Sequence, residues 1–413
     1  MSKYISLIRL VVVALAVVIL GALLGWYFFL HGKTAQTVIQ NTGAGYGVSA
    51  PTFQGSTGST YANVVSTLGA APGSATSTAA RLWEVSAVPV AGFGWQKTSA
   101  PTLDFVERSS GYVFEAQTQS RSVVRLTNVL RPKVYEASIA LDGGLTERSI
   151  DDSGALITFA GGLASSSPSD NASSTPMDLV GTALQTGINA IAIDPVSDTL
   201  FYLVPGPSGV SLVSSSLSGT KQRRIFSSAI VGWRLIAPGD GTLVLQQNPL
   251  DGSTGYAYQL QKTGTLSLIA QAPGLTVLPR ASSSALIFGS SSSGQLSLFV
   301  QPSASISPER LAMQTVADKC AWAPGVSLIA YCAAPLNIPS QNFLNDWYKG
   351  LVHTSDKFYE IDASMASSTL IYDPTGDTSA QFDVQSMSVD PTGQFLAFIN
   401  AKDQSLWVLR ISQ

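Results

Sequence analysis

The sequence is poor in charge. Asp, Glu, Lys and Arg together make up 12% of its 413 residues, which is about half the usual charged share of a soluble domain. The polar surface therefore has to be built largely from Ser, Thr, Gln, Asn and Gly. The formal net charge is -3, so the chain offers no basic field for phosphates, and we expect no nucleic-acid partner.

Cysteine and histidine are also scarce. The chain has only Cys320 and Cys332, and only His31 and His353. Zinc, copper and iron sites are built mainly from these side chains, so we expect neither a metal site nor a cofactor. Most Ser-His-Asp and Cys-His schemes are excluded in the same way, because His31 borders the apolar run described below and only His353 is left as a base. We assign no catalytic residue and expect a protein that is not an enzyme.

One long apolar run stands out near the N-terminus. Residues 10–30 read LVVVALAVVILGALLGWYFFL without a charge, which at 1.5 Å per residue is long enough to cross a hydrocarbon core of about 30 Å. Trp26 and Tyr27 lie near its end, where amphipathic rings favour the membrane interface. We therefore expect one transmembrane helix that contacts the lipid bilayer.

The charges around this run predict its orientation. Lys3 and Arg9 precede it, and after it only Lys33 occurs before Arg81, so the positive-inside rule places the N-terminus in the cytoplasm and the remainder outside. A cleaved signal peptide is the alternative, but its apolar core is typically about 7–15 residues and ends at an A-x-A-like site, which is missing here. We expect a single-pass protein of the cytoplasmic membrane.

The texture of the chain then divides it into three parts. Residues 1–33 are the expected anchor. Residues 34–80 carry no charge and consist mainly of Gly, Ser, Thr and Ala, a composition typical of a flexible linker. From residue 81 to 413, short β-branched and aromatic runs alternate with Gly, Pro, Asp and Ser turns, which indicates an all-β domain.

Two segments of the β region repeat one another. Residues 190–203 (AIAIDPVSDTLFYL) align without gaps on residues 386–399 (SMSVDPTGQFLAFI). Each predicts an alternating strand, an Asp-Pro turn and a more fully apolar second strand. Weaker copies occur at residues 138–144, 235–245, 275–288 and 320–332, and a degenerate one starts at 93–95. The copies recur at a period on the order of 40–50 residues, which is typical of four-stranded propeller blades, and about seven blades result.

The turns VDPTG, IDPVS, ALDGG and APGVS resemble the "SPDG"-type turns of TolB-like and WD40-like β-propellers. The chain is also similar to bacterial proteins that carry an N-terminal anchor and one propeller, a resemblance that implies no particular activity. The last strand, residues 405–411, leaves the final blade one strand short. Residues 81–86 can supply that strand and remove an open edge.

Cys320 and Cys332 lie symmetrically about Val326. If residues 324–327 turn the hairpin, the two thiols face each other on one side of two strands. Outside the cytoplasm we expect a cross-strand disulfide, and the alternative is a pair of buried free thiols.

Several acidic residues invite a functional reading. Asp142, Asp194 and Asp390 could form a ring of metal ligands, but an Asp that begins a turn is explained by its own backbone hydrogen bonds, which we favour. Glu136 and the pairs Glu107-Arg108 and Glu147-Arg148 are isolated charges in strand-rich segments and are expected on solvated faces.

The insertion at residues 335–353, PLNIPSQNFLNDWYKGLVH, differs from the other loops because it concentrates aromatic and polar side chains. Such a segment lies on the surface, where its aromatic residues either pin it to the propeller or contact a partner. The candidate binding residues are Asn337, Phe343, Asp346, Trp347, Tyr348 and Lys349.

These features predict a membrane-tethered extracytoplasmic propeller that acts as an interaction or scaffolding module. Its expected partner is an envelope protein or a surface polymer. The alternative is a hydrolase or lyase that acts on cell-wall glycan or peptide in the propeller funnel, for which paired carboxylates at glycosidase distance would be needed.

Overall fold

The computed structural model describes residues 80–165, 177–197, 199–261, 264–378 and 380–412. The expected anchor at residues 10–30 and nearly all of the linker at 34–80 lie outside these residues. Within the described ranges, no helix has the length and apolarity needed to cross a membrane.

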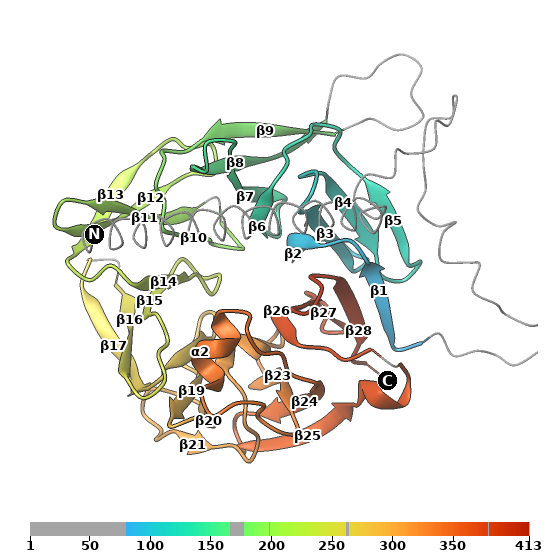
Figure 1. Cartoon of the computed structure of the whole chain (residues 1–413), viewed down its shortest axis with the longest axis vertical. Coiled ribbons are helices and arrows are strands. Elements are labelled where there is room, and N and C mark those ends of the chain that lie inside the picture. The colour runs from blue at the N-terminus through green and yellow to red at the C-terminus, as the bar shows by residue number, and fades with distance from the viewer. Residues whose placement is uncertain (1–79, 166–176, 198, 262–263, 379, 413) are drawn as a thin grey trace, which may run out of the picture. The chain divides into compact units, whose positions relative to one another are not determined.

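The described residues form a seven-bladed β-propeller, and each blade is a four-stranded antiparallel sheet (Figure 1). Blades 1 and 2 consist of β2 (Val90–Trp95), β3 (Thr102–Glu107), β4 (Val113–Gln117), β5 (Ser122–Arg125), β6 (Val134–Ile139), β7 (Gly144–Ile150), β8 (Leu156–Ser165) and β9 (Met177–Ala183). Blades 3 and 4 consist of β10 (Ala190–Ile193), β11 (Leu200–Gly206), β12 (Gly209–Ser215), β13 (Arg223–Ser228), β14 (Trp233–Ile236), β15 (Leu243–Gln247), β16 (Thr254–Leu260) and β17 (Leu266–Pro273).

The remaining blades carry the helical segments. Blades 5 and 6 consist of β18 (Thr276–Pro279), β19 (Leu286–Ser292), β20 (Gln295–Gln301), β21 (Glu309–Arg310), β22 (Cys320–Trp322), β23 (Ile329–Pro335), β24 (Asp356–Asp362) and β25 (Ser367–Tyr372). Blade 7 contains β26 (Val384–Val389), β27 (Phe395–Asn400) and β28 (Leu406–Arg410). The helical segments are η3 (Ala317–Lys319), α2 (Phe343–Tyr348) and η4 (Pro374–Gly376).

The ring is closed by the strand expected to close it. β1 (Leu82–Ser86) pairs antiparallel with β28 and is the outermost strand of blade 7, with Leu82 opposite Leu409. Arg81 reinforces the closure, because its side chain donates hydrogen bonds to the carbonyls of Arg410 and Ile371. The predicted propeller of seven blades is confirmed.

The repeated segments are the hairpins formed by the first two strands of each blade. β10 and β11 hold residues 190–203, and β26 and β27 hold the aligned residues 386–399. All six residues of β27 are buried, and so are the first four of β11. Burial on both faces explains why the second strand of the repeat is almost wholly apolar.

The hydrophobic core is divided among the seams between blades. Each of seven clusters joins two neighbouring blades, and an eighth packs α2 against blade 5. The seam between blades 6 and 7 contains Phe358, Phe382 and Phe398. The ring centroid of Phe398 lies 5.1 Å from that of Phe358 and 5.6 Å from that of Phe382. Stability is thereby spread around the ring.

Cys320 and Cys332 face each other across β22 and β23 in the register predicted for them, and a disulfide joins them. Both belong to the buried cluster between blades 5 and 6. The bridge fixes the hairpin that leads toward η3 and α2.

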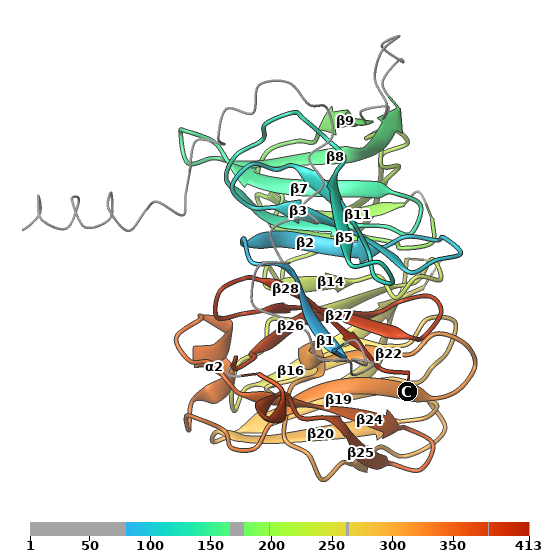
Figure 2. The ribbon, with the colours of Figure 1, turned by 90° about the vertical axis from the view of Figure 1, so that its right-hand side faces the viewer.

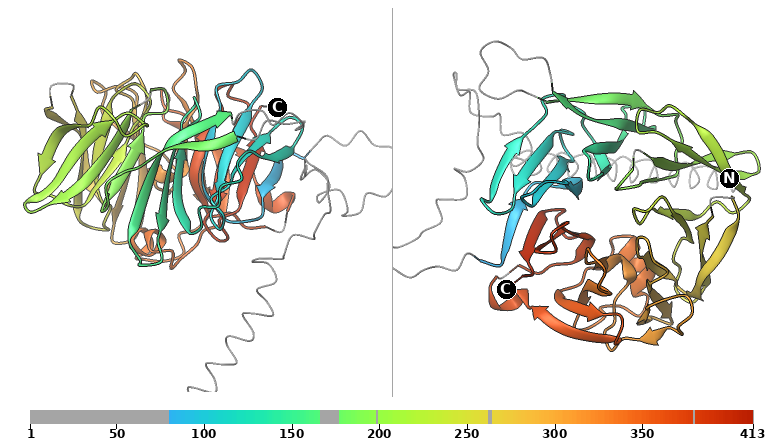
Figure 3. Two further views of the ribbon diagram at one scale, coloured as in Figure 1. Left: turned by 90° about the horizontal axis from the view of Figure 1, so that it is seen from above. Right: turned by 180° about the vertical axis from the view of Figure 1, so that it is seen from behind.

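The propeller has two faces, and we call the one that carries α2 the upper face; in the side view it lies on the left and the lower face on the right (Figure 2). The upper face is formed by the loops that connect one blade to the next and by the loops between the second and third strands of each blade, and it includes α2. The lower face is formed by the loops between the first and second strands and between the third and fourth strands. Figure 3 shows the ring of blades from above and from behind.

Candidate functional site: the upper-face funnel

The aspartates of the repeated turns lie on the lower face and bind backbone. Oδ1 of Asp390 accepts hydrogen bonds from the N–H groups of Gln394 and Phe395 at 2.7 and 2.6 Å, and Oδ2 accepts one from Thr392 at 2.9 Å. Asp194 accepts from Val196 at 3.0 Å and from Gly241 of the next blade at 2.8 Å. The described residues contain no cluster of His, Cys, Asp or Glu suited to a metal ion. The turn geometry explains these aspartates.

The upper face is hollowed by a cavity of about 1050 Å³ at the centre of the ring. Blades 1, 2, 4, 6 and 7 and the segment around α2 all contribute to its wall. We call it the funnel. Its lining residues are Val90, Ala91, Arg108, Tyr135, Glu136, Arg234, Asp318, Trp347, Tyr348, Lys349, Gly350, His353, Asp383, Gln385, Ser386, Ile399, Ala401 and Gln404.

Charge is concentrated in the funnel. Six of its eighteen lining residues are charged at neutral pH, although charged residues make up only 12% of the chain. The wall also contains His353, one of the two histidines. In a protein that builds most of its surface from uncharged polar groups, this concentration marks a functional candidate.

A buried lysine organises one wall of the funnel. Lys319 is fully buried, and its Nζ lies 2.6 Å from Asp356 Oδ2, 2.6 Å from Asp383 Oδ1 and 2.6 Å from Thr354 Oγ1. The chain places Lys319 at the end of η3, and the two aspartates stand just before or at the start of strands in blades 6 and 7. This network ties the two blades together below the funnel surface.

The two aspartates of this network respond to it differently. Burial raises the pKa of Asp356 despite the opposing charge of Lys319. Burial also acts to raise the pKa of Asp383, but Lys319 and the hydrogen bonds from Trp347 and His353 outweigh it and lower that pKa below its usual value. Asp383 is therefore ionised at neutral pH.

Asp383 also positions a histidine at the funnel wall. Its Oδ2 lies 2.8 Å from Nδ1 of His353, and because an ionised carboxylate can only accept, Nδ1 must carry the proton. The His353 side chain is 37% exposed, and its Nε2 makes no hydrogen bond within the described part of the chain. Nε2 is therefore free to make a hydrogen bond at the funnel surface.

A second polar network lies beside α2. Asp318 accepts hydrogen bonds from the Arg234 guanidinium and, at 2.7 Å, from the Tyr348 hydroxyl, while Arg234 Nη1 lies 3.1 Å from that hydroxyl. The Arg234 guanidinium also faces the Tyr348 ring at 5.4 Å. Tyr348 as a whole is 39% exposed, but burial of its hydroxyl end, followed by the charge of Asp318, raises the pKa of the phenol well above its usual value. Tyr348 therefore stays a neutral hydrogen-bonding group.

The insertion at 335–353 is partly helical and packs onto the propeller. Phe343 is 1% exposed and Trp347 is 9% exposed, and both lie in the cluster with Leu296 and Val316. Trp347 Nε1 donates a 2.8 Å hydrogen bond to Asp383. These two aromatic residues hold the insertion in place, as the pinning alternative expects, and Trp347 also lines the funnel.

The other candidate residues of the insertion lie differently. Asp346 accepts hydrogen bonds from Ser340 and Asn342, both at 3.0 Å, and so stabilises the insertion itself. Asn337 is exposed on the approach to α2, and Tyr348 and Lys349 are exposed and line the funnel. Of the six candidates, these three keep side chains that a partner can reach.

Glu147 and Arg148 are not on a solvated face, which corrects that expectation. They are 2% and 7% exposed. Arg148 Nη1 lies 2.6 Å from Glu136 Oε2 at the funnel wall. Burial, opposed by Arg131, raises the pKa of Glu147 to about 7. The sequence of a single strand does not show that a neighbouring part of the ring covers these two side chains.

Exposed apolar side chains are more frequent in the upper-face loops than in the lower ones. Eight large apolar residues with exposed side chains lie in described upper-face loops: Val88, Val129, Leu130, Ile230, Val231, Leu250, Leu336 and Leu351. Four lie in described lower-face loops: Val196, Ile306, Val326 and Met365. Ile230, Val231 and Leu250 are grouped near α2, because the loop of Leu250 bonds to both Gly232 and Asn345. We call these three the rim patch.

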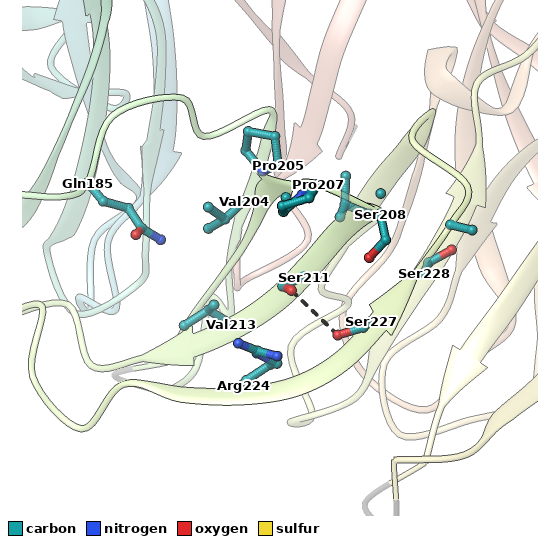
Figure 4. Close-up of a pocket in the computed structure, with 14 residues that line it drawn as sticks. Gln185, Val204, Pro205, Pro207, Ser208, Ser211, Val213, Arg224, Ser227 and Ser228 are labelled. Atoms are coloured by element: carbon teal, nitrogen blue, oxygen red, sulfur yellow. Dashed lines mark hydrogen bonds between the residues drawn. The ribbon is translucent and has the colours of Figure 1, made fainter.

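A second hollow of about 480 Å³ lies at the edge of blade 3 (Figure 4). It is formed mainly by the β11–β12 hairpin and β13, with Ser211 and Ser227 at hydrogen-bonding distance across two strands. Its one charged lining residue is Arg224. It has far fewer groups that could recognise a ligand than the funnel has.

The sequence assigned Arg108 to a solvated face, whereas the structure leaves it half-buried in the funnel wall. It did not single out Arg234, Asp318, Lys319 or Asp383. Apart from the adjacent Asp318 and Lys319 of η3, these residues belong to different blades and follow no common spacing, so no local motif marks them. The one available signal is the scarcity of charged residues. In so charge-poor a chain, a charged residue within a strand-rich segment is expected to be paired with another group. Which of these residues pair with each other becomes visible only in the closed ring.

Comparison with known proteins gives likeness of fold only. No protein-family model matches the chain, and no curated protein matches it in sequence. Among solved structures it is similar to U3-55K, with 10% identity, a TM-score of 0.49, and 80% of this chain and 99% of that chain covered. It is similar to oligogalacturonate lyase from Vibrio parahaemolyticus, with 9% identity, a TM-score of 0.47, and 79% and 98% covered. The propeller domain of the Trilobed protease from Pyrococcus furiosus gives 7% identity, a TM-score of 0.47, and 79% and 98% covered. Function has to be argued from this chain's own residues.

Proposed function

We propose that this protein is a binding module of the cell envelope. Residues 10–30 tether it to the cytoplasmic membrane, the propeller lies outside the cytoplasm, and a protein partner docks on its upper face. The observation that carries this proposal is the concentration of charge in the funnel of a chain with few charges. Polar groups converging in a concave site are typical of recognition.

The rim patch supports a protein as the partner. Ile230, Val231 and Leu250 are 47%, 63% and 53% exposed beside α2. A small polar solute bound in the funnel would not cover them, whereas a protein surface would bury apolar side chains around polar anchors. Tyr348 and Lys349, at and after the end of α2, line the funnel and would contact the same partner.

Site-specific photo-crosslinking tests the docking face. A photoreactive residue in place of Leu250 should give a discrete protein adduct in intact cells, and Lys349→Glu should reduce that adduct. Val326 is the matched control, because it is an apolar lower-face residue with 97% exposure. Equal adducts from both positions, or an adduct that Lys349→Glu leaves unchanged, would contradict docking on the upper face.

The membrane topology has its own test. A reporter enzyme that is active only outside the cytoplasm, fused after Gln413, should be active in cells. This expectation follows from the charges of Lys3 and Arg9 before the apolar run. A stably expressed but inactive fusion would overturn the orientation.

A hydrolase or lyase acting on cell-wall material is the second candidate, and His353 is what favours it. The carboxylates of the funnel wall do not, because Glu136, Asp318 and Asp383 are each ion-paired with a cation. His353, oriented by Asp383, has the geometry of a general base with a free Nε2. Purified full-length protein that releases soluble fragments from peptidoglycan, and loses this activity in His353→Gln, would support the enzyme. No release by the wild-type protein would remove this candidate.

A further inference from the structure

Two cations of the funnel wall, Arg108 and Lys349, have no carboxylate partner among the described residues, and of these only Arg108 is partly buried. Arg148 is ion-paired with Glu136, Arg234 with Asp318, and Lys319 with Asp356 and Asp383. Arg108, at the end of β3, has no carboxylate within ion-pairing distance among the described residues. Its Nη2 donates to the carbonyl of Tyr135, a neutral acceptor.

The surroundings of Arg108 make this lack of a partner costly. Its Nε is buried and has no hydrogen-bond acceptor. Burial lowers the pKa of the guanidinium, and no neighbouring carboxylate opposes that effect. Charged groups removed from water are normally paired, so a partly desolvated arginine at the wall of an open cavity favours an anion from outside.

Two further groups in the funnel can take part. Lys349, which follows α2, is exposed and has no carboxylate partner among the described residues. His353 presents its free Nε2 to the same cavity. The wall also offers Tyr135, Gln385 and Gln404, whose side chains can hydrogen-bond to peptide groups.

We infer that the funnel binds a carboxylate of an acidic polypeptide segment, with Arg108 as the principal anchor and Lys349 as a second cation. This inference rests on the proposed function, since the segment would belong to the partner that docks on the upper face. A carboxylate fits the planar fork of a guanidinium through two parallel hydrogen bonds. Its negative charge would balance Arg108 and Lys349, since Arg234, the other cation in the funnel wall, is already paired with Asp318.

Binding of a defined probe tests the inference. Fluorescein-labelled tetraglutamate should raise its anisotropy on binding full-length protein in detergent micelles, and labelled tetraglutamine should not. Arg108→Gln should weaken tetraglutamate binding by about tenfold or more, because truncating one partner of a desolvated charge pair is costly. Arg223→Gln is the matched control, since Arg223 is an exposed arginine on β13 that does not line the funnel.

Two variants keep the test decisive if Arg108→Gln folds poorly. Arg108→Lys keeps the charge but loses the fork and should bind more weakly than the wild type. Lys349→Gln alters an exposed side chain and should weaken binding with an unchanged melting temperature. Equal binding of tetraglutamate by the wild type, Arg108→Lys and Lys349→Gln would overturn the inference, and so would no binding at all.

Competition identifies the kind of anion. Tetraglutamate should be displaced by unlabelled tetraglutamate at much lower concentration than by free glutamate or acetate. Displacement by inorganic phosphate at lower concentration than by acetate would overturn the carboxylate assignment, and displacement by free glutamate as efficiently as by the peptide would overturn the polypeptide assignment. If these assays fail while the Leu250 crosslink persists, docking on the upper face stands and only the carboxylate site falls.

Discussion

The two faces of this propeller are built in different ways. On the lower face, one local solution is repeated: an aspartate begins a turn and accepts backbone N–H groups of that turn or of the next blade, as Asp194 and Asp240 do. On the upper face, side chains from blades that are far apart in the sequence meet in the funnel, as Arg234 and Asp318 do. The lower face is therefore stabilised by the same turn hydrogen bonds in several blades, whereas the side chains of the upper face differ from blade to blade.

This difference teaches where function can be placed in a repeat protein. A turn that is needed for the backbone cannot change freely without loss of stability, whereas the upper-face loops carry insertions such as the one around α2. If that interpretation is right, substitutions on the two faces will have different costs and different consequences.

The largest loss of stability is expected from Lys319→Met. It leaves Asp356 and Asp383 buried without their cation, and removing one partner of a buried ion pair costs about 3–5 kcal/mol. Denaturant unfolding of the purified protein measures the free energy. Lys349→Met is the control, because it removes an exposed lysine of the same funnel and should stay within about 0.5 kcal/mol. Equal losses in the two variants would show that the buried network is not a structural element.

Trp347→Ala should cost about 3 kcal/mol, because it empties a packed position between α2 and the funnel wall. Trp347→Phe keeps most of the packing but loses the hydrogen bond to Asp383 and should cost about 1 kcal/mol. Thermal unfolding of both variants, together with crosslinking from Leu250, separates packing from binding. An unchanged melting temperature in Trp347→Ala would restore Trp347 as a binding residue.

Asp390→Ala on the lower face should cost about 2 kcal/mol, since it leaves the buried N–H of Phe395 and the partly buried N–H groups of Thr392 and Gln394 without an acceptor. Asp142→Ala should cost about 0.5 kcal/mol, because the exposed Asp142 accepts a single backbone bond of 3.2 Å. Neither should change partner capture from Leu250. Lost capture in a stably folded Asp390→Ala would remove the distinction between the two faces.

The contrast between the faces also explains what the sequence could predict. The repeat at residues 190–203 and 386–399 is local, so the hairpins, the blade number and the closing strand could be predicted from it. The opposed positions of Cys320 and Cys332 follow from strand geometry alone. These are properties of segments that contact themselves or their sequence neighbours.

The funnel was beyond such reasoning. Lys319 and Asp383 are 64 residues apart, and Arg108 lines the same cavity from blade 1, so only the closed ring brings them together. The sequence located the insertion around α2 but could not tell buried aromatic residues from exposed ones. Phe343 and Trp347 are buried because α2 packs against Leu296 of blade 5, a contact that the sequence of the insertion does not show.

The pairing of β1 with β28 determines when the ring can close during synthesis. β1 ends at Ser86 and its partner begins at Leu406, so 320 residue positions separate them. At about 5–20 residues per second, synthesis of that interval takes roughly 15–60 s. During this delay β1 has an unpaired edge, and the apolar residues it brings to the seams beside blade 7 have nothing to cover them. The nascent chain therefore passes through a long open-ring stage, and its last blade is finished only when the first strand is retrieved.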